Sequence, residues 1–212
     1  MPTFGPTVPA RDAMIENANP TFNYGARNIV EATRYNPGDS RTVAAWNVSG
    51  VPTGVVVGTA SIAAVIQQNT LSGATGFGVF PVIPNEFHFA EGTGTGSATG
   101  DGVTWNAIYS GTNWTTPGGD YDAAFKSAFS ATSGLTTITI DVKTALQKAL
   151  DSYRDINNLI ALLLKRDSES GSSAFFRLWS KQADTPANAW TLTFDYTVPG
   201  GMLRRNGGLF VA

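Results

Sequence analysis

The segment 174–196 constrains the fold more than any other. Its sequence, AFFRLWSKQADTPANAWTLTFDY, contains two aromatic-rich runs separated by a polar stretch. In the second run Trp190, Leu192 and Phe194 occupy every other position, with polar residues between them. A period of two with aromatic and β-branched residues is typical of half-buried β-strands. We therefore expect a closing hairpin of two strands, with Leu192 and Phe194 in the core and Asp195 on the opposite face.

Similar patterns predict strands along most of the chain. The run 159–165 is continuously apolar, which indicates a strand buried on both faces, and turn-forming Asn, Pro and Gly residues separate many of the others. The other predicted strands are 12–17, 28–33, 42–48, 55–66, 77–83, 86–89 and 136–142.

Only the segment 143–153 has the spacing of a helix. Its apolar residues recur every three to four positions and form one apolar face. Asp141 is placed to cap the N-terminus of this helix. We expect the helix to cover an open end of a β-sandwich, so the predicted fold is an all-β, jelly-roll-like antiparallel sandwich with one short helix.

The two ends of the chain are expected to be arms outside a sandwich domain that spans residues 12–198. Residues 1–11 contain three prolines, which favour an extended arm because proline fixes φ and lacks a backbone donor. Residues 199–212, PGGMLRRNGGLFVA, contain two Gly-Gly pairs that precede short apolar pairs. These apolar residues have no obvious partner in their own domain. This pattern predicts either a flexible tail or an arm that packs on a neighbouring subunit by strand addition. The predicted contact residues of such an arm are Met202, Leu203, Leu209 and Phe210.

Composition excludes several classes of function. Charged residues make up 14% of the chain, against about 25% in an average domain. The net charge of -2 argues against a nucleic-acid-binding surface, which would show clustered basic residues. Cysteine is absent, so disulfides and thiolate metal sites are excluded. No stretch approaches the roughly 20 apolar residues of a membrane span. The N-terminus lacks the features of a secretory signal, so synthesis in a cytoplasm is expected.

The sequence shows no catalytic constellation, and we expect a protein that is not an enzyme. His88 is the only histidine, and a catalytic triad would need it beside a nucleophile in an oriented site. The glycine-rich loop 91–102 lacks both the spacing and the following helix of a phosphate-binding motif. Acidic pairs occur in several loops, but a glycosidase needs two carboxylates across a cleft. Solvated loop charges are the simpler interpretation.

Two kinds of binding site are compatible with the residues present. Loop carboxylates can hold a structural calcium ion, since hard cations take carboxylate and carbonyl oxygens; the candidates are Asp12, Asp120 and Asp195. No other cofactor is expected. Aromatic residues can also form a platform for sugars, built from Trp105, Tyr109, Trp114 and Tyr121, and the candidate glycan-binding residues are Trp105, Trp114 and Tyr121. The alternative for these rings is burial beneath their loops, which is the commoner fate of large aromatics.

The order of these signals resembles that of the DNRLRE-type β-sandwich domain. The resemblance covers most of residues 11–198 and is carried by short motifs: Asp12-Ala13, then Pro20-Thr21-Phe22-Asn23-Tyr24-Gly25, residues 41–49, Val103-Thr104-Trp105-Asn106, Trp114 with Pro117-Gly118-Gly119-Asp120, and the blocks 138–150 and 162–196. The resemblance implies a jelly-roll module of the kind found in bacterial and archaeal surface proteins, related in style to carbohydrate-binding modules.

Two functions follow as expectations. The first is a structural subunit of a bacteriophage virion, of the capsid-decoration or fibre type, whose partners are other virion subunits or further copies of itself. Jelly rolls recur in capsid and lectin-like roles, and a virion protein needs no secretion signal. The second is a carbohydrate-binding or adhesion module at a microbial cell surface, with polysaccharide as its partner. Exposure of the rings at Trp105, Trp114 or Tyr121 would favour the second.

Overall fold

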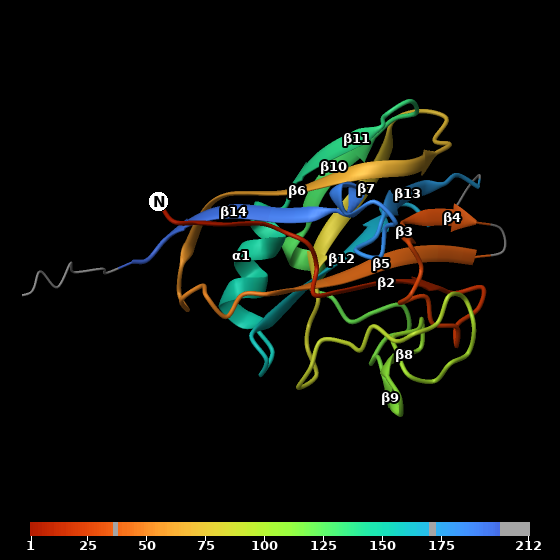
Figure 1. The fold of residues 1–212 in the computed structure, drawn as a ribbon, viewed down its shortest axis with the longest axis horizontal. Coiled ribbons are helices and arrows are strands. Elements are labelled where there is room, and N and C mark those ends of the chain that lie inside the picture. The colour runs from red at the N-terminus through yellow and green to blue at the C-terminus, as the bar shows by residue number, and fades with distance from the viewer. Residues whose placement is uncertain (36–37, 170–172, 200–212) are drawn as a thin grey trace, which may run out of the picture.

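Two antiparallel sheets pack face to face in the computed structural model, which describes residues 1–35, 38–169 and 173–199 (Figure 1). The predicted all-β sandwich is confirmed. The first sheet has the order β1 (Thr3–Thr7), β14 (Thr191–Thr197), β6 (Val56–Asn69), β13 (Phe176–Trp179) and β3 (Ile29–Glu31), and β11 (Thr137–Asp141) also pairs with β6. The second has the order β10 (Ser127–Ala131), β7 (Thr75–Pro81), β12 (Leu159–Arg166), β5 (Gly38–Asn47) and β2 (Arg11–Glu16), and β4 (Thr33–Tyr35) also pairs with β5. A small hairpin joins β8 (Ala107–Tyr109) to β9 (Thr112–Asn113).

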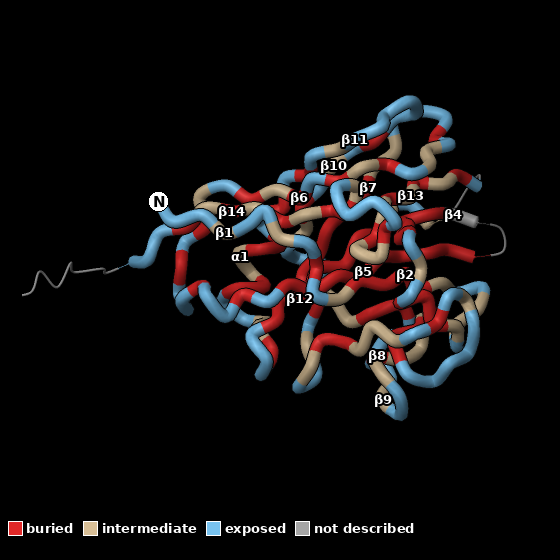
Figure 2. Tube along the Cα trace, in the orientation of Figure 1, coloured by how far each residue is buried: buried red, intermediate tan, exposed pale blue. Residues whose placement is uncertain are grey.

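The second sheet is covered on both of its faces, which explains the continuous apolar run in β12. Ile160, Leu162 and Leu164 face the main core between the sheets. The alternate residues of the strand, Leu159, Ala161 and Leu163, face a second core beneath the loops that follow β7. In Figure 2 the buried segments accordingly run through the middle of the molecule, and the exposed segments lie at its ends and loop tips.

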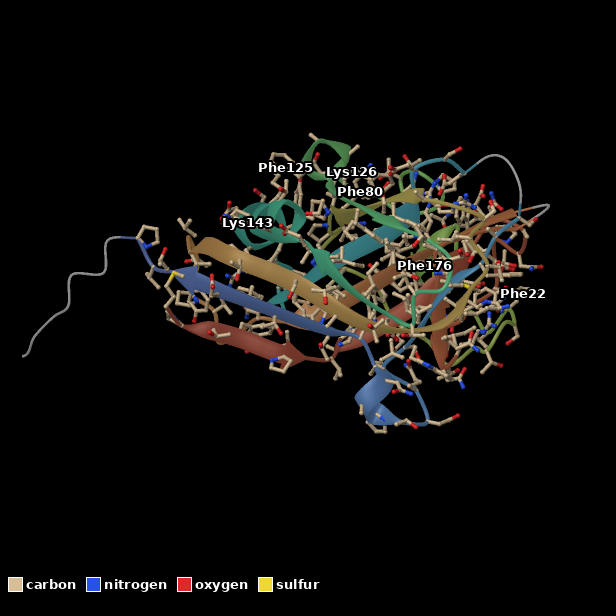
Figure 3. All side chains as sticks on the ribbon, turned by 90° about the horizontal axis from the view of Figure 1, so that it is seen from above. Phe22, Phe80, Phe125, Lys126, Lys143 and Phe176 are labelled. Atoms are coloured by element: carbon tan, nitrogen blue, oxygen red, sulfur yellow. The ribbon has the colours of Figure 1, made fainter. Side chains whose placement is uncertain are left out.

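The predicted closing hairpin is wrong. β13 and β14 are both antiparallel to β6, so they run in the same direction and cannot pair as a hairpin. They follow one another along one edge of β6, while β11 takes the other edge. Residues 180–190 leave the sheet between them and carry the short 3-10 helix η2 (Pro186–Asn188), which projects from the sandwich as the blue loop in Figure 3.

The faces predicted for this segment are nevertheless confirmed. Leu192 and Phe194 are buried in the main core, and Asp195 lies on the opposite face. Alternation reports which face of a sheet a residue occupies and says nothing about the neighbouring strand. The alternating pattern therefore could not predict which strand β13 or β14 pairs with.

The helix α1 (Lys143–Ser152) lies where the pattern places it. It buries Ala145, Leu146, Ala149 and Leu150 and packs against β6 of the first sheet and β12 of the second. Its N-cap position is Val142 rather than Asp141. The carboxylate of Asp141 still accepts a hydrogen bond from the backbone N–H of Lys143, at 2.9 Å.

Some local predictions differ from the structure. Residues 86–89 form a turn rather than a strand, with only a single bridge between Asn85 and Phe87 and a positive φ of 42° at Glu86. The strands β1, β4, β8, β9 and β10 were not predicted, because short segments carry too few residues for a clear period. None of the helices in the described residues is long and apolar enough to cross a membrane.

The N-terminal residues are extended, as expected, but they belong to the sandwich rather than to an arm beside it. β1 pairs with β14, and the rings of Phe4 and Phe194 stack with their centroids 4.8 Å apart. The indole N–H of Trp46 donates to the carbonyl oxygen of Thr7 at 3.1 Å. The predicted assembly residues Met202, Leu203, Leu209 and Phe210 lie outside the described residues.

Candidate functional site

The loops between β7 and β10 build a layer on the outer face of the second sheet, below β2 and β5 in Figure 1. Two cavities open in this layer, with volumes of about 680 Å³ and about 500 Å³. Asn113 and Thr115 line both cavities, so the cavities adjoin at the end of β9. Both volumes lie in the range of small-molecule pockets, roughly 300–1,000 Å³. We call the two cavities together the loop groove.

The wall of the loop groove combines apolar, aromatic and neutral polar groups. Its larger cavity contains Ile83, Pro84 and Ile108 beside the ring of Tyr121. The polar side chains of this cavity are Asn85, Asn113, Thr115, Thr116 and Asp120. Apolar walls with a few convergent polar groups are typical of ligand sites, in which the polar groups orient the ligand.

Asp120 shapes the loop that forms one wall of the groove. Its two carboxylate oxygens accept hydrogen bonds from the backbone N–H groups of Thr115 and Thr116, at 2.7 and 2.8 Å. The backbone carbonyl of Asp120 also accepts from the N–H of Ile83, at 3.0 Å. The carboxylate of Asp120 therefore closes the loop 115–120, and its backbone carbonyl ties the loop to the residues after β7.

Arg41 on β5 supports the same loop from below. Its guanidinium forms a bidentate pair with Glu169, at 2.7 and 2.8 Å, and donates to the carbonyl oxygen of Gly118 at 2.7 Å. The cation also lies over the ring of Trp105, 4.6 Å from its centroid. Burial acts to raise the pKa of Glu169, but the hydrogen bond and charge of Arg41, with the charge of Lys165, lower that pKa below its usual value. The guanidinium of Arg41 therefore has a structural role.

The three predicted sugar-binding rings have different environments. Trp114 is only 4% exposed, and its indole N–H donates to the carbonyl oxygen of Thr104 at 3.0 Å, so burial was the correct alternative for this ring. Trp105 is half-buried beneath Arg41. Tyr121 is half-buried, packs on Phe80 with centroids 4.9 Å apart and lines the larger cavity. The aromatic side chain that remains for a ligand in this cavity is therefore Tyr121.

The three predicted calcium ligands do not come together. Asp12 accepts from the indole N–H of Trp190 at 2.7 Å and from the backbone N–H of Lys181 at 2.9 Å. Asp195 accepts from the N–H and hydroxyl of Thr59, at 2.7 and 3.0 Å, and Asp120 closes its own loop. Each carboxylate is used by local donors. In the described part of the chain, no three or more acidic, histidine or cysteine side chains gather as a metal site.

The glycine-rich loop 91–102 has a structural explanation that the sequence pattern did not reveal. The fully buried side chain of Asn23 donates to the carbonyl oxygens of Glu91 and Val103, at 2.7 and 2.9 Å, and accepts from the N–H of Gly94 at 2.7 Å. A Cβ atom at Gly92, Gly94 or Gly102 would lie within 2.5 Å of an atom of Asn23. The loop contains these glycines because its backbone wraps closely around one amide.

His88 is completely buried, and its Nε2 atom lies 3.1 Å from the carbonyl oxygen of Leu159. Burial lowers the pKa of this histidine, so its neutral form is favoured. Asp155, on the turn after α1, accepts from the backbone N–H groups of Asn157 and Leu159, both at 2.8 Å. These groups hold the turn and the start of β12 in place.

The sequence predicted one residue of the larger cavity's aromatic wall and missed its neutral polar wall. Asn85, Asn113, Thr115 and Thr116 belong to turn-rich stretches, where such residues are common for conformational reasons alone. Their convergence on one cavity depends on contacts between loops distant in sequence. No family model matches the chain, and no curated protein matches it either.

Proposed function

We propose that this protein is a non-enzymatic assembly subunit of a virion, of the bacteriophage capsid-decoration or fibre type. The observation that supports self-assembly is a patch of exposed apolar side chains where the described chain ends. Met1, Val56 and Val198 are 75%, 53% and 46% exposed. Exposed apolar side chains gathered in a patch are characteristic of interaction surfaces. We call these three residues the end patch.

Several contacts place the end patch at one tip of the first sheet. Val56 on β6 is paired with Thr197, the residue before Val198. The backbone N–H of Tyr196 donates to the carbonyl oxygen of Pro2, next to Met1, at 3.1 Å. The apolar pairs Met202-Leu203 and Leu209-Phe210 follow within 14 residues of Val198 in the sequence, outside the described residues. Apolar surface and apolar sequence together favour burial against a neighbouring subunit.

We expect the double variant Val56→Lys/Val198→Lys to lose self-association, because two charges would have to be buried at the contact. Size-exclusion chromatography with light scattering measures the mass of each species. Ile156→Lys is the matched control, since Ile156 is 71% exposed in the turn after α1 and is not part of the end patch. A wild-type protein that is monomeric at every concentration, or an oligomer unchanged in the double variant, would contradict assembly through this patch.

The virion assignment has its own experiment. Peptide mass spectrometry of density-gradient-purified particles from lysates of the source strain is expected to detect this chain in the particle fraction. Detection of the chain only in the soluble fraction would overturn the assignment, whatever its oligomeric state.

A second candidate function is polysaccharide binding, and the loop groove is the observation that favours it. The groove combines the half-buried ring of Tyr121 with exposed amide and hydroxyl groups, which suits the apolar faces and hydroxyls of sugars. Isothermal titration with a panel of oligosaccharides is expected to show binding that is weakened by Thr115→Ala. Blank titrations across the panel would remove this candidate.

A further inference from the structure

We propose that the loop groove is a binding site selective for uncharged glycans. The inference rests on the second candidate function, polysaccharide binding, and adds the chemical class of the ligand. It depends on three features of the groove: the neutral polar groups on its wall, the absence of a cation among the described residues that line it, and the continuity of its two cavities.

The polar groups on the wall are free to serve a ligand. Asn85, Asn113, Thr115 and Thr116 are exposed, and within the described residues their side chains form no hydrogen bonds. An amide offers two donors and an acceptor, and a hydroxyl offers both roles. Sugar hydroxyls need both roles from their partners, whereas a carboxylate or sulfate ligand needs donors alone. The mixture of groups therefore matches an uncharged, hydroxyl-rich ligand.

The charges around the groove disfavour an anionic ligand. Asp120 is the only charged side chain among the described residues that line either cavity. Two cations contact the ring of Tyr121: Arg41 and Lys165 lie 5.8 and 5.9 Å from its centroid. Both cations are paired with Glu169, at 2.7 and 3.4 Å. An anionic glycan would therefore meet one carboxylate and no cation among the described residues that line the two cavities, in a protein of net charge -2.

The two cavities form one continuous site for a chain of sugars. Asn113 and Thr115 line both of them, and Tyr109 lines the smaller cavity as Tyr121 lines the larger. Tyr109 is half-buried and makes an edge contact with Phe87, with centroids 6.5 Å apart. Each cavity thus offers one tyrosine, and the polar residues Asn113 and Thr115 are shared by the two cavities. This arrangement suits an oligosaccharide with successive residues on either side of β9.

Affinity electrophoresis tests the selectivity directly. The full chain is run in native gels that contain either an uncharged polysaccharide (galactomannan, xyloglucan or laminarin) or an anionic one (polygalacturonate or alginate). We expect retardation by at least one uncharged polysaccharide and none by the anionic ones. Equal or stronger retardation by the anionic polysaccharides would overturn the selectivity while leaving polysaccharide binding intact. No retardation by any of the five would overturn both.

Two variants locate the binding. Asn113→Ala is expected to weaken the retardation about two- to tenfold, since one net hydrogen bond to the ligand is lost. Asn157→Ala, an exposed asparagine in the turn after α1, is the control and is expected to bind as wild type. Circular dichroism checks that both variants fold. Binding by folded Asn113→Ala that equals wild type would place the ligand elsewhere and contradict the loop groove as the site.

Discussion

Asp12 is an acidic residue in an almost fully buried environment. It points between the sheets from β2, is only 1% exposed and accepts from Trp190 and Lys181 through one carboxylate oxygen. Its other oxygen, Oδ1, is buried without a hydrogen-bond partner among the described residues. Burial raises the pKa of Asp12 from 3.8 to about 6, and the nearby charge of Glu91 also acts to raise it.

This raised pKa makes the stability of the fold depend on pH. The folded protein binds the proton of Asp12 more tightly than the unfolded chain does, so the stability contributed by that proton is fully present below pH 3.8 and is lost as the pH rises through about 6. A shift of roughly two pKa units corresponds to about 3 kcal/mol in the free energy of unfolding.

We expect Asp12→Asn to remove this pH dependence. Urea unfolding of both proteins at several values between pH 4 and pH 7 gives the difference in free energy of unfolding at each pH. The charged groups nearest to Asp12 are Glu91 and Lys181, which both proteins retain. The difference is therefore expected to change by up to about 3 kcal/mol in favour of the variant as the pH rises. Parallel profiles would show that Asp12 does not titrate in this range.

At the scale of elements, the first sheet is held together by β6. Its 14 residues pair with β14 and then β13 on one edge and with β11 on the other. β1 extends the sheet beyond β14 and covers Phe194 with the ring of Phe4. An unpaired strand edge is prone to pairing with other chains, so β1 also protects the edge of β14. Its proline, Pro6, is tolerated because the outer side of an edge strand needs no donors.

The contribution of β1 to stability is tested by Phe4→Ala. The loss of the stacked ring is expected to lower the free energy of unfolding by about 1–3 kcal/mol, since the ring is half-buried. Thr3→Ala is the control on the same strand, because Thr3 is exposed and its replacement is expected to change stability by less than about 0.5 kcal/mol. Equal effects of the two substitutions in urea unfolding would show that β1 is not integrated into the sandwich.

At the scale of the whole molecule, the position of the loop groove depends on the second core. Leu159, Ala161 and Leu163 turn the outer face of the second sheet into an apolar platform, and Trp114 packs on it from above. The platform fixes the loops that carry Asn85 and Asn113 relative to one another. The end patch, by contrast, lies at the tip of the first sheet, in the region of β6 and β14. The two proposed functions therefore use separate surfaces, and a single subunit has room for both.

The fold class, the helix and the faces of the strands could be predicted from the amino-acid sequence. These properties follow from local periodicity, because burial of one face imposes a period of two on a strand and of 3.6 on a helix. Leu192, Phe194 and Leu146 were placed in the core for this reason. The burial of β12 on both faces was also predicted from the sequence, because a strand covered on both faces has apolar residues at odd and even positions alike.

The pairing of the strands and the convergence of the polar loop residues became known from the folded structure. Apolar and polar residues alternate in β13 and β14 as they would in the two strands of a hairpin, yet each strand pairs with β6. The alternation carries no information about which strand is the partner. The reason for the glycines in the loop 91–102 is visible only in the structure, where the loop wraps around the side chain of Asn23. The loop groove arises in the same way, from contacts between segments that are distant in sequence. Contacts between distant segments produce no periodic pattern in the sequence. The site that they form can therefore be recognised only in the folded molecule.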